Sequence, residues 1–150
     1  MVARGLAYAD IDLDGDLDVL FTTSGGKPLL LRNDTKRGKS KHHAIRVVLR
    51  GVESNKSGIG ARVEADLDQQ VAQETKIRRI VRSGSSYLSQ SELPLTLGLG
   101  EATRAVRITV RWPSRSTTVL QNVAAGQGIT IEEGKGIVHA QSLGPSQEKK

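Results

Sequence analysis

The sequence predicts an all-β protein, and three observations support this prediction. Apolar and charged residues alternate with period two in "AIRVVLR", where Ile45, Val47 and Leu49 point to one face and the arginines to the other. The segment "ARVEADL" alternates in the same way, while almost no stretch shows the 3.6-residue period of a helix. Breaks rich in Gly, Ser and Asp separate these segments. Strands with one apolar and one charged face usually form antiparallel sheets, so we expect an antiparallel β-sandwich or barrel-like domain.

A third alternating segment, "AVRITVRW" (105–112), contains the single tryptophan of the chain. We expect Val106, Ile108, Val110 and Trp112 to share the buried face of this strand, opposite its arginines. The proline that follows Trp112 ends the strand, and a large indole ring at this point belongs in the core.

The chain has 150 residues, enough for one ordinary domain or two small ones. A polar, basic stretch without large apolar residues reads as a linker and divides it. The last residues are polar, and we expect them to be disordered. The expected parts are a short N-terminal part at 1–32, a linker at 33–43, a β body at 44–140 and a disordered tail at 141–150.

The N-terminal part contains two apolar segments, "VLFTT" (19–23) and "LLLR" (29–32), on either side of the turn "SGGKP". They predict a hairpin of two buried strands. Three strands at most, with no second layer, cannot bury enough apolar surface to be stable alone. We therefore expect this part to belong to a larger assembly.

Composition excludes several classes of function. There is no cysteine, which excludes disulfides, thiolate chemistry and zinc sites of the cysteine type. Aromatic residues make up only 3% of the chain, which argues against a base-stacking platform and makes nucleic acid an unlikely partner. No segment approaches the roughly 18 apolar residues of a membrane span, and no apolar signal segment follows Met1. We expect either an intracellular protein or a fragment of a longer one.

Charge is distributed unevenly along the chain. Residues 1–31 hold two basic and five acidic side chains, whereas residues 32–150 hold twenty basic and eleven acidic ones. All five acidic residues of the first part lie in "DIDLDGDLD" (10–18). Carboxylates packed this closely repel one another, so a bound cation is the simplest explanation for them.

The spacing D-x-D-x-D-G-x-x-D places carboxylates at Asp10, Asp12, Asp14 and Asp18. Alternate residues of a tight loop can converge on one ion, and Gly15 permits the sharp turn. An EF-hand requires a glutamate at loop position twelve, where this chain has a phenylalanine. Calcium suits such a flexible shell better than magnesium. A metal-free acidic turn and a catalytic carboxylate pair are the alternatives.

The stretch "GLAYADIDLDGDLDVLFTTSGGKPLLLRND" resembles one repeat of the FG-GAP/VCBS type, the calcium-carrying blades of integrin-α-like β-propellers. The resemblance implies a remnant of a propeller blade, arranged as strand, calcium loop and hairpin. It also implies side-chain ligands from Asp10, Asp12, Asp14 and Asp18, with the main-chain carbonyl of Asp16 as a further Ca²⁺ ligand.

The rest of the chain resembles the ASPIC/UnbV domain, through "SNKSGIGARVEA", "RSGSSYLSQSELPLTLGLG" and "VRITVRWPSRSTTVLQNV". The chain departs from the pattern of that family at several positions, and "HHAI" (42–45) lacks the tryptophan often found after the histidine pair. Ser86 and Arg115 stand where the family has glycine, and Leu97 stands where it has an aromatic residue. The last departure weakens the case for binding through aromatic side chains.

Together the resemblances imply a non-enzymatic, calcium-binding β module of a secreted or cell-surface protein, the C-terminal part of a longer propeller protein. The implied partner is a protein or a glycan. One alternative is an accessory domain of a larger enzyme. Another is a polyanion-binding module, in which a row of arginines forms a basic sheet face. The arginines concerned are Arg46, Arg50, Arg62, Arg78, Arg79, Arg82, Arg107 and Arg111.

Three polar segments leave smaller questions open. His42 and His43 are adjacent and face opposite sides of an extended chain, which favours a linker role over metal binding. "SNKSGIGAR" forms either a bend that enters a strand or a backbone nest for an anion. "RSGSSYLSQS" either binds a sugar or peptide or closes the β body, with Tyr87 capping its edge.

Overall fold

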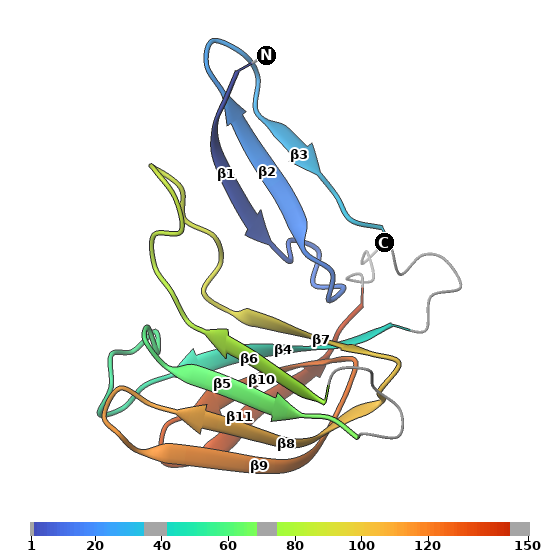
Figure 1. The fold of residues 1–150 in the computed structure, drawn as a ribbon, viewed down its shortest axis with the longest axis vertical. Coiled ribbons are helices and arrows are strands. Elements are labelled where there is room, and N and C mark those ends of the chain that lie inside the picture. Colours follow the sequence, from blue (N-terminus) through green and yellow to red (C-terminus); the bar gives the residue numbers. More distant parts are fainter. Residues whose placement is uncertain (1, 35–41, 69–74, 145–150) are drawn as a thin grey trace, which may run out of the picture.

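The computed structural model describes residues 2–34, 42–68 and 75–144. Eleven β-strands and no helix form the regular structure of these residues, which confirms the all-β prediction (Figure 1). The described part of the chain therefore offers no helix with the length and hydropathy that crossing a membrane requires. The strands are β1 (Ala3–Ala9), β2 (Asp18–Thr23), β3 (Leu29–Leu31), β4 (His43–Arg50), β5 (Arg62–Asp66), β6 (Lys76–Ile80), β7 (Leu95–Gly100), β8 (Arg104–Arg111), β9 (Thr117–Ala124), β10 (Gln127–Glu132) and β11 (Gly136–Ser142).

The first three strands form an antiparallel sheet of their own, in the order β1-β2-β3. Figure 1 shows this sheet standing apart from the other eight strands. The loop between β1 and β2 lies at the end of the sheet that is closer to those strands. The predicted hairpin is present, but the prediction that its strands are buried is wrong. In β2, Leu20 is exposed and Val19 and Phe21 are only partly buried. Leu29, Leu30 and Leu31 are all exposed, because no second layer covers this sheet within the described residues.

The other eight strands form two four-stranded sheets packed face to face, in the orders β11-β10-β4-β7 and β6-β5-β8-β9. We call this two-layer sandwich the body. One pair departs from the prediction of purely antiparallel sheets, because β4 and β10 are parallel. In the sequence, β10 comes after all four strands of the second sheet. Strand β4 has the alternation of apolar and charged residues that usually accompanies antiparallel pairing, so its sequence could not reveal this parallel pair.

The core lies between the two sheets and is built from the predicted apolar faces. Ile45 and Val47 come from one sheet, and Val63 and Ile108 come from the other, all without solvent exposure. Trp112 is buried as predicted, and its Nε1 donates a hydrogen bond to the hydroxyl of a threonine on β9.

One residue of the predicted core faces solvent. Val106 is exposed, and it is not among the residues of β8 that pair with β9, although the register is the same on both sides of it. Asn122, the residue left out of the pairing on β9, has a φ of +52°, so both strands are irregular at this point. Ala105 takes the buried position in its place, and the alternation resumes at Ile108.

The ends of the body differ slightly from the expected boundaries. Strand β11 continues through Ser142, and the amides of Leu143 and Gly144 still donate hydrogen bonds to backbone carbonyls. The expected tail therefore begins later than residue 141. Residues 145–150 of that tail and 35–41 of the expected linker lie outside the described residues.

The bend that leads into β5 contains a glycine that no other residue can replace easily. Gly58 has a φ of +64°, and a Cβ built there would lie 2.8 Å from the Cβ of Leu49. We expect Gly58→Ala to lower the free energy of unfolding by about 3 kcal/mol, measured by urea denaturation, through backbone strain and overpacking together. Gly84→Ala is the matched control, because Gly84 has a φ of +68° but open space around it, and it should cost only about 1 kcal/mol. Equal losses in the two variants would contradict the packing argument.

Candidate metal centre

The loop between β1 and β2 brings three of the predicted ligands together. Carboxylate oxygens of Asp10, Asp12 and Asp14 all lie within 4.8 Å of one another. Gly15, with a φ of +91°, makes the turn, and its amide donates a hydrogen bond of 3.1 Å to Oδ2 of Asp10. The amide of Asp16 donates a hydrogen bond of 2.9 Å to Oδ1 of Asp14. Within the part of the chain that the structure describes, Asp10, Asp12 and Asp14 form the group of side chains that could hold a metal ion.

Burial makes this cluster unlike an ordinary acidic turn. Asp10 is only 3% exposed, and Oδ1 of Asp10 and Oδ1 of Asp12 are buried without a hydrogen-bond partner. Burial raises the pKa of Asp10, against the lowering effects of the Gly15 amide and of the Arg46 guanidinium. A buried carboxylate oxygen without a donor is costly, and oxygen is the ligand that hard cations prefer. The donor set therefore fits a hard divalent cation.

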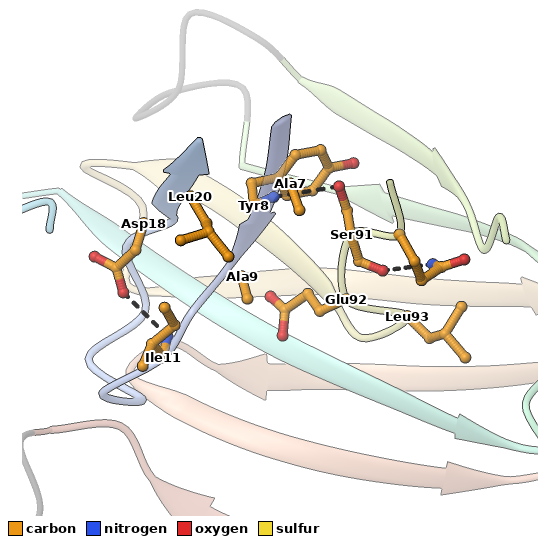
Figure 2. A pocket seen from close by; sticks show the side chains of 10 residues that line it. Ala7, Tyr8, Ala9, Ile11, Asp18, Leu20, Ser91, Glu92 and Leu93 are labelled. Atoms are coloured by element: carbon orange, nitrogen blue, oxygen red, sulfur yellow. Dashed lines mark hydrogen bonds between the residues drawn. The ribbon is translucent and has the colours of Figure 1, made fainter. Parts of the chain in front are cut away.

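Asp18 plays a different part in this arrangement. Its carboxylate is 2% exposed and fastens the loop from two directions, accepting hydrogen bonds of 3.1 Å from the Ile11 amide and 2.8 Å from the Asn33 amide. The first of these bonds is drawn in Figure 2. Asp18 lies outside the group of three oxygens, so metal ligation by Asp18 and by the carbonyl of Asp16 stays a prediction.

The same loop is joined to the body through Arg46 on β4. The guanidinium of Arg46 forms an ion pair of 2.5 Å with Glu92, and its Nε lies 3.7 Å from Oδ2 of Asp10. Glu92 in turn accepts a hydrogen bond of 3.1 Å from the Asp10 amide, and its own amide donates to the carbonyl of Tyr8. Asp10 is therefore both a candidate ligand and the point of attachment to the body.

The segment before β7 lies along the free edge of β1, where Ser91 accepts a hydrogen bond from the Tyr8 amide. A cavity of about 470 Å³ lies between this segment and the three-stranded sheet, with Ala7 and Leu20 on one side and Leu93 on the other (Figure 2). The expectation that Tyr87 caps the edge of the body is wrong. Its side chain is 79% exposed at the tip of the segment.

A carboxylate that the sequence analysis did not single out organises the opposite end of the body. Glu133 follows β10, and one of its oxygens accepts hydrogen bonds from the three backbone amides of residues 52–54. The other oxygen accepts from the hydroxyls of Ser54, Ser114 and Ser116. Burial alone would raise the pKa of Glu133, but these donors, Ser114 foremost, hold it far below its ordinary value.

This arrangement answers the question about "SNKSGIGAR". Its glycines form the bend that enters β5, as one alternative predicted, with Gly58 and Gly60 at positive φ. A backbone nest is also present, but it is formed by residues 52–54, overlaps the segment only at Ser54, and holds the protein's own Glu133. The contacts of Glu133, like those of Arg46 and Glu92, join residues distant in the chain, so no local motif marked them.

The fold and the site together define a two-layer β domain that carries a small, separate sheet with an acidic loop. The sequence profile of the family described as ASPIC and UnbV matches residues 51–138, more than half of the chain. The chain therefore belongs to the ASPIC and UnbV family, and domains of this family occur in larger proteins of an extracellular type. No curated protein is similar enough to the chain to count as a match.

Proposed function

We propose that the aspartate loop binds Ca²⁺ and that the ion holds the three-stranded sheet against the ASPIC/UnbV body. The observation that carries this proposal is the convergence of three carboxylates within 4.8 Å, two of them with buried oxygens that lack a hydrogen-bond donor. The role is structural, and the proposal assigns the site no catalytic step. It further places the module in a secreted or cell-surface protein, where calcium is abundant.

Electrostatics supports a divalent cation. Arg46 forms an ion pair with Asp10 and shares its charge with Glu92. Asp10, Asp12 and Asp14 bring three carboxylates close together, and close like charges repel strongly away from bulk water. Ca²⁺ accepts six to eight oxygens at variable angles, whereas Mg²⁺ demands a near-octahedral shell. A flexible loop of three aspartates and nearby carbonyls suits the former.

The proposed ion would act on the junction through Asp10. This residue offers its carboxylate to the cluster and donates its amide to Glu92 of the body. Fixing the carboxylate therefore also fixes the amide. The β1 edge stays beside Glu92 and Ser91, and the module presents the small sheet in one orientation to its partner. The partner that we propose for this surface is a protein or a glycan.

Thermal unfolding with excess EDTA, with Ca²⁺ and with Mg²⁺ tests the proposal. A ligand at about 100 times its dissociation constant stabilises the fold by about 2.7 kcal/mol, so Ca²⁺ should raise the melting temperature clearly. Asp12→Asn should remove most of this shift, because it takes one charge from the cluster. Glu53→Gln is the matched control, since it removes one exposed carboxylate at the other end of β4 and should leave the shift intact. A cooperative melt that Ca²⁺ does not move would refute the calcium site.

A further inference from the structure

The outer face of the sheet β6-β5-β8-β9 is charged along its whole length, but its two ends differ. At one end the charges neutralise each other in ion pairs. Asp66 lies 2.9 Å from Arg107 and 3.4 Å from Lys76, and Glu64 lies 3.3 Å from Arg78. The Arg107 hydrogen bond, foremost, lowers the pKa of Asp66, so this end is ionised and self-compensated.

At the other end two arginines lie side by side. Arg62 at the start of β5 is directly opposite Arg111 at the end of β8. Ile80 lies on the far side of Arg62, and Thr117 lies on the far side of Arg111. Both arginines are exposed, and neither forms an ion pair with any described residue. Like charges directly across a strand pair destabilise a sheet, so this arrangement has a cost within the fold itself.

Two more arginines extend this end of the sheet. Arg82 follows Val81, whose amide continues the ladder by bonding to the carbonyl of Ala61. Arg115 lies in the turn from β8 to β9 and is exposed. Its φ is +76°, a conformation that glycine adopts freely and that strains any other residue. Arg115 donates its amide to the carbonyl of Trp112, so the turn itself imposes this conformation.

We infer that this arginine end, defined as Arg62, Arg82, Arg111 and Arg115, binds the anionic groups of a sulfated polysaccharide. These four exposed arginines form no ion pair with a described residue, and their charges match the repeated negative charges of such a polymer. Glu133, the carboxylate that accepts hydrogen bonds from Ser114 and Ser116 of this turn, accepts six hydrogen bonds in all and forms no ion pair with Arg115. The backbone strain at Arg115 costs stability, so an exposed arginine at this position also indicates a role in binding.

The neighbours of these arginines favour a polysaccharide over a nucleic acid. Ile80 pairs with Arg62 across the strands, and Thr117 pairs with Arg111. These two neighbours offer an aliphatic surface and a hydroxyl group. Proteins that bind single strands stack bases on aromatic rings, and the single tryptophan of the chain, Trp112, is buried.

The structure also revises which arginines take part. Arg46 does not lie on an exposed basic face, because it is buried in its ion pair with Glu92. Arg50, Arg78 and Arg107 form ion pairs with carboxylates. Arg79 lies opposite Val63, a core residue, and so is not on the outer face of the sheet. Only Arg62, Arg82 and Arg111 remain from the set that the sequence suggested, and Arg115 joins them.

Binding of a fluorescent heparin oligosaccharide to the full chain, measured by anisotropy at about 50 and about 200 mM salt, tests this inference. The double variant Arg62→Thr/Arg111→Thr should weaken binding about tenfold at the lower salt and flatten the salt dependence. Arg78→Thr/Arg107→Thr is the matched control, because it removes the same charge from the same face at paired positions. It should change the affinity less than about threefold. Equal losses in the two double variants would overturn the inference.

Arg115→Gly separates binding from folding. Relief of the strained turn should raise the melting temperature by about 4 °C, while the affinity for heparin falls. A variant that is more stable cannot lose binding through unfolding. Unchanged affinity in this variant would remove Arg115 from the site. Tighter binding of a single-stranded oligonucleotide of equal charge would overturn the choice of a polysaccharide.

Discussion

Glu133→Ala should lower the melting temperature by more than about 10 °C, the largest single loss that we expect in the body. The substitution leaves three partly buried backbone amides and three partly buried serine hydroxyls without their acceptor. A donor that is withdrawn from water and has no partner carries a desolvation cost. The change also unties the loop at residues 52–54 from the turn that contains Ser114. Differential scanning calorimetry near neutral pH measures the loss.

Glu132→Ala provides the comparison from the adjacent residue. Glu132 forms ion pairs with Arg50 and Lys135, whose side chains are mostly exposed, so its loss should cost less than about 2 °C. Glu133→Gln should fall between the two, because serine hydroxyls can rotate and accept from an amide. Similar losses at positions 132 and 133 would show that the buried network is not the cause.

The effect of Glu133 also has a defined pH dependence. Its pKa in the folded protein lies far below the ordinary value of 4.5, so the unfolded chain takes up the proton first as the pH falls. Its stabilising contribution is complete above pH 4.5 and is lost progressively below it. The gap in melting temperature between the wild type and Glu133→Ala should therefore be constant near neutrality and narrow in acid.

Arg46→Met should lower the free energy of unfolding by about 3 kcal/mol, because removing one partner leaves buried charges uncompensated. Arg46 is 15% exposed, and it faces Asp10 and Glu92, whose side chains are 0% and 10% exposed. Urea denaturation measures the total loss. Hydrogen exchange should also show faster exchange at the amides of Tyr8 and Asp10, since both bond to the segment that Arg46 holds.

Arg50→Met is the control on the same strand. Its partner Glu132 is shared with Lys135, and Arg50 itself is 61% exposed, so the loss should stay within about 0.5 kcal/mol. A double-mutant cycle with Glu92→Gln should give a coupling energy of about 1–3 kcal/mol for Arg46 with Glu92. No coupling, or equal effects of Arg46→Met and Arg50→Met, would contradict the role of this junction.

Local patterns predicted most of the strands and the acidic cluster. Alternation at Ile45 and Val47 is a property of neighbouring residues, and so is the spacing that brings Asp10, Asp12 and Asp14 together. The burial of a strand could not be predicted reliably, because it depends on whether another layer of the structure packs against that strand. The exposure of the β3 leucines depends on the absence of a covering layer in the described residues, which their own sequence cannot show.

The contacts between distant residues could not be predicted at all. Glu133 is an ordinary glutamate in the sequence, and only the closed sandwich brings it to residues 52–54. Arg46 looks like the charged side of an alternating strand, yet the loop that contains Glu92 folds over it. Both pairings join segments far apart in the chain, where composition and spacing contain no information.

The parallel pairing of β4 with β10 has a consequence for how the chain folds. Strand β4 is the first of the body to leave the ribosome, but its partner edge beside Ile45 is filled only when Gln127 has been made. Closing so long a loop is slow, and an unpaired strand edge attracts other chains in the meantime. The nascent body is therefore exposed to aggregation throughout the synthesis of its second sheet, and a chaperone that covers β4 would improve its yield.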